Sequence, residues 1–192
     1  MDVRKNIFRL RGYTPIPLAL AILYLSGKEW TFLLPGIFII LIGELIRFNG
    51  VRYAGGATRT RNVGAKTLCT SGPFSRVRNP LYLGNMLIYL GIVLLADGQY
   101  VWIMFVITLL FFSLQYGLII SLEEQTLSGL FGAEYQMYKE NVPQLIPRLT
   151  PWRGGTKTDP KSWLATLKTE RGTLLTLITF VILLFIKKQF FS

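Results

Sequence analysis

Residues 70–85 read TSGPFSRVRNPLYLGN, a polar, basic and turn-rich stretch that lies between long apolar runs. Gly72-Pro73 is a turn signal, and Pro80 suits the first turn of a helix, where its missing N–H has no partner to lose. The pattern therefore predicts two tight turns in this stretch, and it places the two arginines and the tyrosine at the end of a membrane helix. Such a loop either fixes membrane topology by its charge or forms part of a binding pocket, and these residues alone leave both readings open.

The composition predicts an integral membrane protein. Hydrophobic residues make up 51% of the 192 residues, the mean hydropathy is +0.42, and the apolar residues come in blocks. We therefore expect a single membrane domain over residues 1–192. The net charge of +11 comes without any nucleic-acid-binding motif, so it indicates loops that face anionic lipid and no nucleic-acid partner.

Two absences narrow the chemistry. The sequence has no histidine, which excludes Ser-His-Asp triads, haem with a histidine ligand and His-based zinc sites, and we expect no metal. Cys69 is the one cysteine, so no intrachain disulfide forms, and with no histidine to activate it we expect a structural, reduced thiol.

No small-x-small cleavage site follows the first apolar run, so we expect that run to be retained as a helix.

Five apolar runs predict an all-α, polytopic protein with about five transmembrane helices. The first and last runs are short against the ~20 residues that a span needs. The tight connector Asp97–Gln99 makes the third and fourth runs an antiparallel hairpin, and small residues such as Gly84 and Gly91 suit close helix packing. The runs cover residues 13–25, 32–48, 81–96, 100–122 and about 172–187.

The polar segments between the runs carry further predictions. Residues 49–80 read as one long polar loop, in which Gly55-Gly56 is a weak phosphate-binding signal because no strand–glycine–helix context surrounds it. Residues 123–141 read as an amphipathic helix at the interface, ended by Val142-Pro143. A second short interfacial helix is predicted to start at Asp159-Pro160, with three apolar side chains facing lipid, namely Trp163, Leu164 and Leu167.

Charges within and beside the apolar runs point to a cytoplasmic site. Glu44 and Arg47 share a helical face, so they form either a helix-end ion pair or a substrate contact. Of the 21 Lys and Arg, all but Lys28, Lys187 and Lys188 fall on the side of the N-terminus. The positive-inside rule then places the N-terminus, the loop 49–80 and the segment after the fourth run in the cytoplasm, and the C-terminus on the opposite side.

Two segments carry a resemblance to a known family. Ser71–Gly84 (SGPFSRVRNPLYLG) resembles the glycine-proline-aromatic, arginine-histidine-proline and tyrosine signature of the membrane methyltransferases, which include isoprenylcysteine carboxyl methyltransferase and the phospholipid N-methyltransferases. Glu123–Pro147 (EEQTLSGLFGAEYQMYKENVPQLIP) resembles the C-terminal signature of that family. The resemblance covers about residues 65–147. Asn79 stands where the family usually has histidine, and the chain continues into an additional C-terminal apolar run.

The resemblance implies an enzyme that uses S-adenosylmethionine in a cytosolic pocket and methylates a lipid or lipidated acceptor that enters from the bilayer. The pocket would form between the loop before the third helix and the segment after the fourth. Arg78, Glu123 and Glu124 are the expected catalytic residues. The expected cofactor-binding residues are Gly72, Pro73, Arg78, Asn79, Pro80, Tyr82, Gly84, Glu123, Glu124, Tyr135 and Tyr138.

The residue chemistry agrees with this implication. Arg78 can hold the carboxylate of a zwitterionic amino-acid group, and Glu123 or Glu124 can accept hydrogen bonds from its ammonium. Tyrosine rings can pack on adenine or on a sulfonium. Asn79 can still hydrogen-bond a base edge or a ribose hydroxyl. The charged pairs could also be only positive-inside anchors and a solvated helix end.

Three function classes remain open from the sequence. A carboxylate acceptor needs no general base, which favours carboxyl O-methylation of an isoprenylcysteine-like substrate. The alternative is N-methylation of a phospholipid ethanolamine, in which a glutamate would take the proton. A non-catalytic membrane protein that retains the pocket is a second class, supported by Asn79. A small transporter or channel subunit is disfavoured because the runs hold few strongly polar residues. The sequence does not indicate an oligomeric state.

Overall fold

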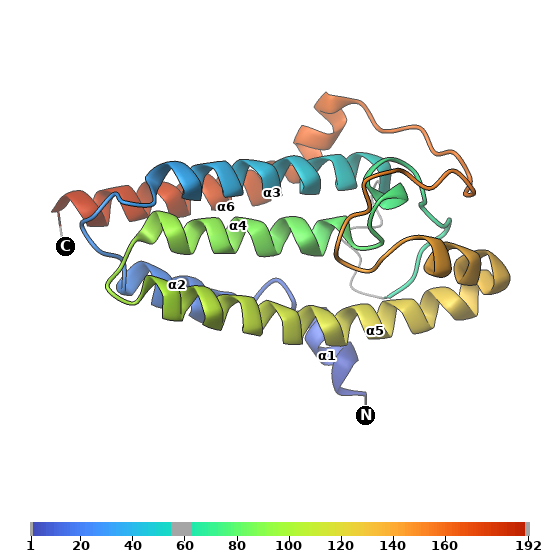
Figure 1. The fold of residues 1–192 in the computed structure, drawn as a ribbon, viewed down its shortest axis with the longest axis horizontal. Coiled ribbons are helices and arrows are strands. Elements are labelled where there is room, and N and C mark those ends of the chain that lie inside the picture. The colour runs from blue at the N-terminus through green and yellow to red at the C-terminus, as the bar shows by residue number, and fades with distance from the viewer. Residues whose placement is uncertain (1, 55–62, 191–192) are drawn as a thin grey trace.

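The structure is all-helical over the residues it describes. This computed structural model describes residues 2–54 and 63–190, and none of these residues lies in a strand (Figure 1). The elements in chain order are α1 (Val3–Leu10), α2 (Ile16–Tyr24), α3 (Leu33–Ala54), the 3₁₀ turn η2 (Gly72–Ser75), α4 (Pro80–Ala96), α5 (Val101–Asn141) and α6 (Trp163–Phe190).

Three of these helices are long and apolar enough to cross a membrane, which fits a membrane protein. They are α3, α5 and α6, and α4 is a shorter apolar helix of 17 residues. The first apolar run forms only α2, whose nine residues span about 14 Å of a hydrocarbon core of about 30 Å. The helix lengths among the described residues therefore do not support the predicted count of five spans.

Helices α3 and α4 touch backbone to backbone through glycines spaced seven residues apart. A Cβ added to Gly43 would lie 2.7 Å from the Gly84 carbonyl oxygen, and one on Gly84 would lie 2.6 Å from that of Gly43. A Cβ added to Gly36 would lie 2.9 Å from the Gly91 carbonyl oxygen, and one added to Gly91 would lie 2.8 Å from the Gly36 carbonyl oxygen. Small residues allow the two backbones to approach this closely. Close packing of this kind holds helices together inside a membrane, where the hydrophobic effect does not drive one helix against another.

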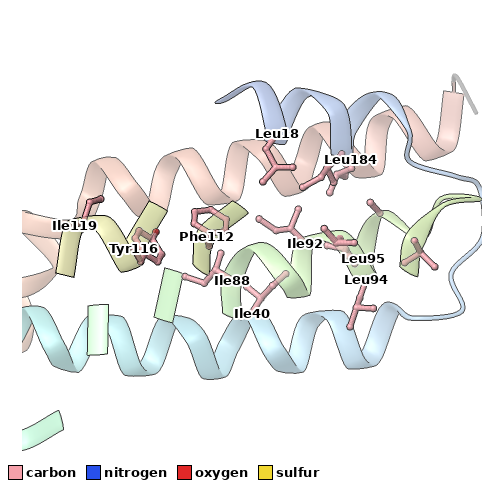
Figure 2. Packing of buried hydrophobic residues seen from close by; sticks show 14 of the residues in the cluster. Leu18, Ile40, Ile88, Ile92, Leu94, Leu95, Phe112, Tyr116, Ile119 and Leu184 are labelled. Carbon is pink, nitrogen blue, oxygen red and sulfur yellow. The ribbon is translucent and has the colours of Figure 1, made fainter. Parts of the chain in front are cut away.

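The apolar core lies where the long helices meet. Figure 2 shows Ile40 of α3, Ile88 of α4 and Phe112 of α5 packed together, with Leu18 of α2 and Leu184 of α6 closing one side. Phe112 and Leu184 have no exposed surface. The core therefore fixes α4 between α3 and α5 (Figure 1), and it leaves the polar ends of these helices at the edge of the bundle.

Helix α5 is longer than a span requires. It is continuous from Val101 to Phe131, about 46 Å, so the first residues of the predicted interfacial helix 123–141 directly continue the apolar helix. The break comes at Gly132, whose φ of 50° lies in the left-handed region that glycine tolerates. The helix then ends at Asn141, before Val142-Pro143, as predicted.

Two more boundaries differ from the sequence prediction. Helix α3 continues to Ala54, so the first residues of the predicted loop 49–80 are helical, while Gly55-Gly56 lies outside the described residues. No helix starts at Asp159-Pro160. Instead, α6 begins at Trp163 and runs without interruption into the last apolar run. The apolar side chains at its start, Trp163, Leu164 and Leu167, are exposed, as expected for a lipid-facing surface.

Candidate functional site

A cavity of about 1190 Å³ opens at the end of the bundle where the 63–79 loop meets the second half of α5. Its walls come from α1, α3, α4, α5, α6 and the loop. The polar and charged residues on the wall include Arg11, Arg47, Lys66, Arg78, Asn79, Tyr82, Asn85, Tyr116, Glu123, Glu124, Tyr135, Tyr138, Glu170 and Thr173.

Backbone hydrogen bonds join the two segments that carry the resemblance. The Arg78 N–H donates to the Pro143 carbonyl oxygen over 2.9 Å, and the Arg148 N–H donates to the Arg76 carbonyl oxygen over 3.0 Å. The Tyr138 hydroxyl donates to the Phe74 carbonyl oxygen over 2.8 Å. The expected meeting of the loop before α4 with the segment after the apolar part of α5 is therefore present in the structure.

Arg78 forms a clamp at the end of α5. Its Nε and Nη2 donate to Oε1 of Glu124 over 3.1 and 2.8 Å, and its Nη1 donates to the carbonyl oxygens of Lys139 and Val142. Lys139 Nζ lies 3.3 Å from the other carboxylate oxygen of Glu124. These bonds satisfy carbonyls at the α5 C-terminus that have no partner within the helix. Arg78 and Glu124 thus pair with each other, although the sequence assigned them to opposite ends of a bound amino-acid group.

Glu123 faces a different partner. The Tyr82 hydroxyl donates to Glu123 Oε1 over 3.0 Å, and the Tyr82 ring stacks on Tyr116 with centroids 4.6 Å apart. Adjacent residues of a helix point about 100° apart, so the two neighbouring glutamates separate into two sets of contacts. The Tyr82–Glu123 pair is a polar contact on the wall that directly faces the cavity.

The other expected site residues divide into two groups. Asn79, Pro80, Tyr135 and Tyr138 lie on the cavity wall, and Asn79 Nδ2 donates to the Gln144 carbonyl oxygen over 3.1 Å. The residues expected in the pocket that do not line it are Gly72, Pro73 and Gly84.

Each of these absences from the wall has a physical reason. Gly72 has φ of 59° and opens the turn η2, and a Cβ there would collide with the Tyr53 ring. Pro73 follows it inside the turn. Gly84 lies in the contact between α3 and α4. The structure therefore gives all three residues a part in chain geometry.

A buried charge cluster borders the cavity on the α3 side. Arg47 donates from Nε and Nη2 to the Glu44 carboxylate over 3.0 and 2.6 Å, which confirms the predicted ion pair. Arg47 Nη1 also donates to Glu170 of α6, a contact that the sequence analysis missed. Arg47 is 5% and Glu170 is 2% exposed. The available signal was a lone glutamate just before an apolar run, the same pattern that drew attention to Glu44.

Cys69 also lies on the wall. Burial raises the pKa of its thiol, so the thiolate form is disfavoured and the residue is a poor nucleophile at neutral pH. Among the described residues, no group of three or more acidic, cysteine or histidine side chains is arranged to hold a metal ion.

Comparisons with known proteins show the family of the chain. The model of the phospholipid methyltransferase family matches residues 31–134, which include α3, α4 and most of α5. Over 88 residues the chain is 36% identical to the cobalt-zinc-cadmium resistance protein CzcN of Cupriavidus metallidurans, covering 46% of this chain and 39% of that protein. Over 100 residues it is 31% identical to methanethiol S-methyltransferase 2 of Bradyrhizobium diazoefficiens, covering 52% of this chain and 36% of that protein.

The aligned part thus covers less than half the length of each of these two curated relatives. No solved structure matches the chain.

Proposed function

Because the chain belongs to the phospholipid methyltransferase family, we propose that it transfers a methyl group from S-adenosylmethionine to a lipophilic acceptor. The main structural support for this proposal is one cavity at the end of the apolar helices, whose wall contains both the Arg78–Glu124 ion pair and the Tyr82–Glu123 hydrogen bond. The charge distribution of the chain favours a cytoplasmic position for this cavity.

The wall residues fit the proposed cofactor. The cavity is larger than the ~300–1,000 Å³ of common ligand pockets, so it has room for a nucleoside cofactor and part of a second molecule. Glu123 offers a carboxylate to an ammonium group. Arg78 makes four hydrogen bonds and keeps one Nη2 N–H without a partner among the described residues, which can bind a carboxylate. S-adenosylmethionine, when bound, supplies an electrophilic methyl group carried on a sulfonium.

The protein's own work in such a reaction is to position groups and to exclude water. Tyr82, Tyr135 and Tyr138 place aromatic rings on the wall, where they can contact a flat base or a cation. The clamp of Arg78 on Glu124, Lys139 and Val142 holds the loop against α5, so that the two halves of the wall keep their spacing. Asn79 is bonded to the Gln144 backbone and keeps its amide oxygen available as an acceptor.

A carboxylate on a lipidated, isoprenylcysteine-like molecule is the first candidate acceptor. Such a group needs no general base. Among the described wall residues four cations, Arg11, Arg47, Lys66 and Arg78, stand against three carboxylates, Glu123, Glu124 and Glu170, and this balance favours an anionic head.

A phospholipid amine is the second candidate, and one observation favours it. Glu123 accepts a hydrogen bond from Tyr82 at the cavity wall, so it is an available proton acceptor at Oε2 for an ammonium group that must deprotonate before methylation. The anionic phosphate of such a lipid also suits the cations of the wall.

A labelling assay tests the proposal and separates the two acceptors. The detergent-purified chain is incubated with S-adenosylmethionine carrying a labelled methyl group and a total membrane lipid extract, and the labelled product is identified by mass spectrometry. We expect label in a methyl ester or in a methylated headgroup amine, together with saturable S-adenosylhomocysteine binding by calorimetry. Absence of both label and binding heat would refute the proposal.

A further inference from the structure

Helix α6 lies outside the part of the chain that the family model matches, yet it forms part of the cavity wall. The match ends at residue 134, whereas Glu170 and Thr173 of α6 line the cavity. Helix α6 runs alongside α3 (Figure 1). Its start is fastened there: the Trp163 ring stacks on Phe48 with centroids 5.6 Å apart, and the Arg52 guanidinium lies 3.9 Å from the centroid of the Trp163 ring.

The link from α6 to the cavity passes through Arg47. A guanidinium has five N–H donors, and Arg47 uses three of them, two on Glu44 and one on Glu170. Its remaining two donors have no partner among the described residues, although the side chain is 6% exposed and lines the cavity. Buried donors are rarely left unpaired in proteins, so these two N–H groups are placed to meet an oxygen atom of a ligand.

The depth of Arg47 separates it from the Arg78 clamp. A Cβ added to Gly84 would lie 2.9 Å from the Arg47 Cβ, which places Arg47 level with the second turn of α4, among the apolar helices. Arg78, Tyr135, Tyr138 and Cys69 belong instead to the loop side of the cavity. The cavity therefore has a loop-side part and a membrane-side part, and α6 contributes to the second.

We propose that Glu170 is a positioning residue for the acceptor. It holds the Arg47 guanidinium at the membrane-side wall, and the two remaining N–H groups of Arg47 bind an oxygen atom on the polar head of the lipophilic acceptor. This inference rests on the proposed methyl transfer and assigns a role in it to a helix outside the matched family region. It predicts that a change at Glu170 weakens acceptor binding and leaves cofactor binding unchanged.

Two cysteine reporters test this inference without requiring turnover. Cys69 reports on the loop side, and Thr173→Cys in a Cys69→Ser background reports on the membrane side. The rate of alkylation of each thiol is measured with increasing S-adenosylhomocysteine or with increasing probe lipid. The probe lipids are N-acetyl-S-farnesylcysteine and dioleoylphosphatidylethanolamine, one for each proposed acceptor class.

The second fastening of α6 provides the control. Lys187 Nζ donates to the carbonyl oxygens of Tyr24 and Ser26 over 2.9 and 2.8 Å, at the end of α6 far from the cavity. Lys187→Gln therefore loosens α6 without changing the cavity wall. Glu170→Asp keeps the carboxylate and is the conservative variant that should restore function.

The expected result is a split between the two ligands. S-adenosylhomocysteine protects Cys69 at the same concentration with and without Glu170→Gln. A probe lipid protects the Thr173→Cys thiol, and Glu170→Gln raises the lipid concentration needed by about tenfold, as expected for a misplaced charge-assisted hydrogen bond. Glu170→Asp needs a lipid concentration close to that of the unchanged protein, and Lys187→Gln needs the same concentration as the unchanged protein.

Three outcomes would overturn the inference: no protection of the Thr173→Cys thiol by either lipid, an equal shift for both ligands, or a loss with Lys187→Gln as large as with Glu170→Gln. Failure of S-adenosylhomocysteine to protect Cys69 would count against the proposed function instead. Protection by lipid would then still decide whether Glu170 and Arg47 form a lipid-binding site.

Discussion

Glu123 and Glu124 are neighbours in the chain with different physical settings. Glu124 is held by Arg78 and Lys139, and its side chain is 12% exposed, while Glu123 accepts a hydrogen bond from the Tyr82 hydroxyl. The first setting suits a structural ion pair. The second suits a group that meets a ligand, and the two residues should therefore respond differently to loss of charge.

We predict that Glu123→Gln abolishes methyl transfer and leaves stability nearly unchanged, because the amide oxygen can still accept from Tyr82. Glu124→Gln should lower the free energy of unfolding by about 3 kcal/mol, because it leaves the poorly exposed Arg78 without its counter-ion. Labelled methyl incorporation and thermal unfolding in detergent measure the two effects. Glu140→Gln, at an exposed position of α5, is the control and should change neither. Equal loss of stability in both variants would contradict the assignment.

The buried thiol of Cys69 leads to a prediction about the pH dependence of its alkylation. Burial raises the pKa of its thiol, so the reactive thiolate forms only at higher pH than in the unfolded chain. We expect the alkylation rate of the folded protein to keep rising with pH after that of the guanidinium-unfolded protein has levelled off. A folded-state rate that levels off at the same pH or lower would show that the thiol is not buried as described.

At the scale of elements, the pair α3 and α4 depends on glycine. Gly84→Ala would place a Cβ 2.6 Å from the Gly43 carbonyl oxygen, so the helices must separate. We expect a loss of about 1–3 kcal/mol in the free energy of unfolding, the usual effect of overpacking. Gly117→Ala in α5 is the matched control, because its Cβ would meet no atom within 4 Å. That change should be neutral or slightly stabilising.

The affinity for S-adenosylhomocysteine can be measured on the same two variants, Gly84→Ala and Gly117→Ala. Because Gly84 lies between the helices and does not itself line the cavity, folded Gly84→Ala should bind S-adenosylhomocysteine with unchanged affinity. A loss of affinity with normal stability would instead support the role in cofactor binding that the family resemblance implies.

Some element boundaries follow from local chemistry and others do not. Helix α4 starts at Pro80 and stops at Asp97, whose φ of 45° cannot continue a helix, so the sequence prediction of 81–96 differs by a single residue. The helix predicted over 123–141 is present and ends before Pro143 as predicted, and its first residues continue the apolar part of α5 up to the kink at Gly132. The predicted helix start at Asp159-Pro160 was wrong, because α6 begins at Trp163 and continues into the last apolar run. Hydropathy reports where the environment changes, whereas a helix keeps its internal hydrogen bonds across that change.

At the scale of the whole molecule, the cavity and the C-terminus lie at opposite ends of the bundle (Figure 1). With the positive-inside rule this predicts a cytoplasmic cavity and a C-terminus on the other side. In intact cells, a membrane-impermeant maleimide should label Gln99→Cys, which is exposed in the connector between α4 and α5, and should leave Cys69 unlabelled. Inside-out vesicles should show the reverse, and labelling of both positions from one side would contradict this topology.

Local sequence patterns were enough to predict the class of the molecule, its family and the two segments that meet at the cavity. Hydropathy and turn residues are local properties, and the two signature segments carry 12 of the 31 described wall residues, including Tyr82, Glu123 and Arg78. The pairings within the site were decided only by the tertiary structure. Arg47 and Glu170 lie 123 positions apart, and Arg78 and Glu124 lie 46 positions apart. Such contacts depend on how whole helices pack, which no local pattern of residues specifies.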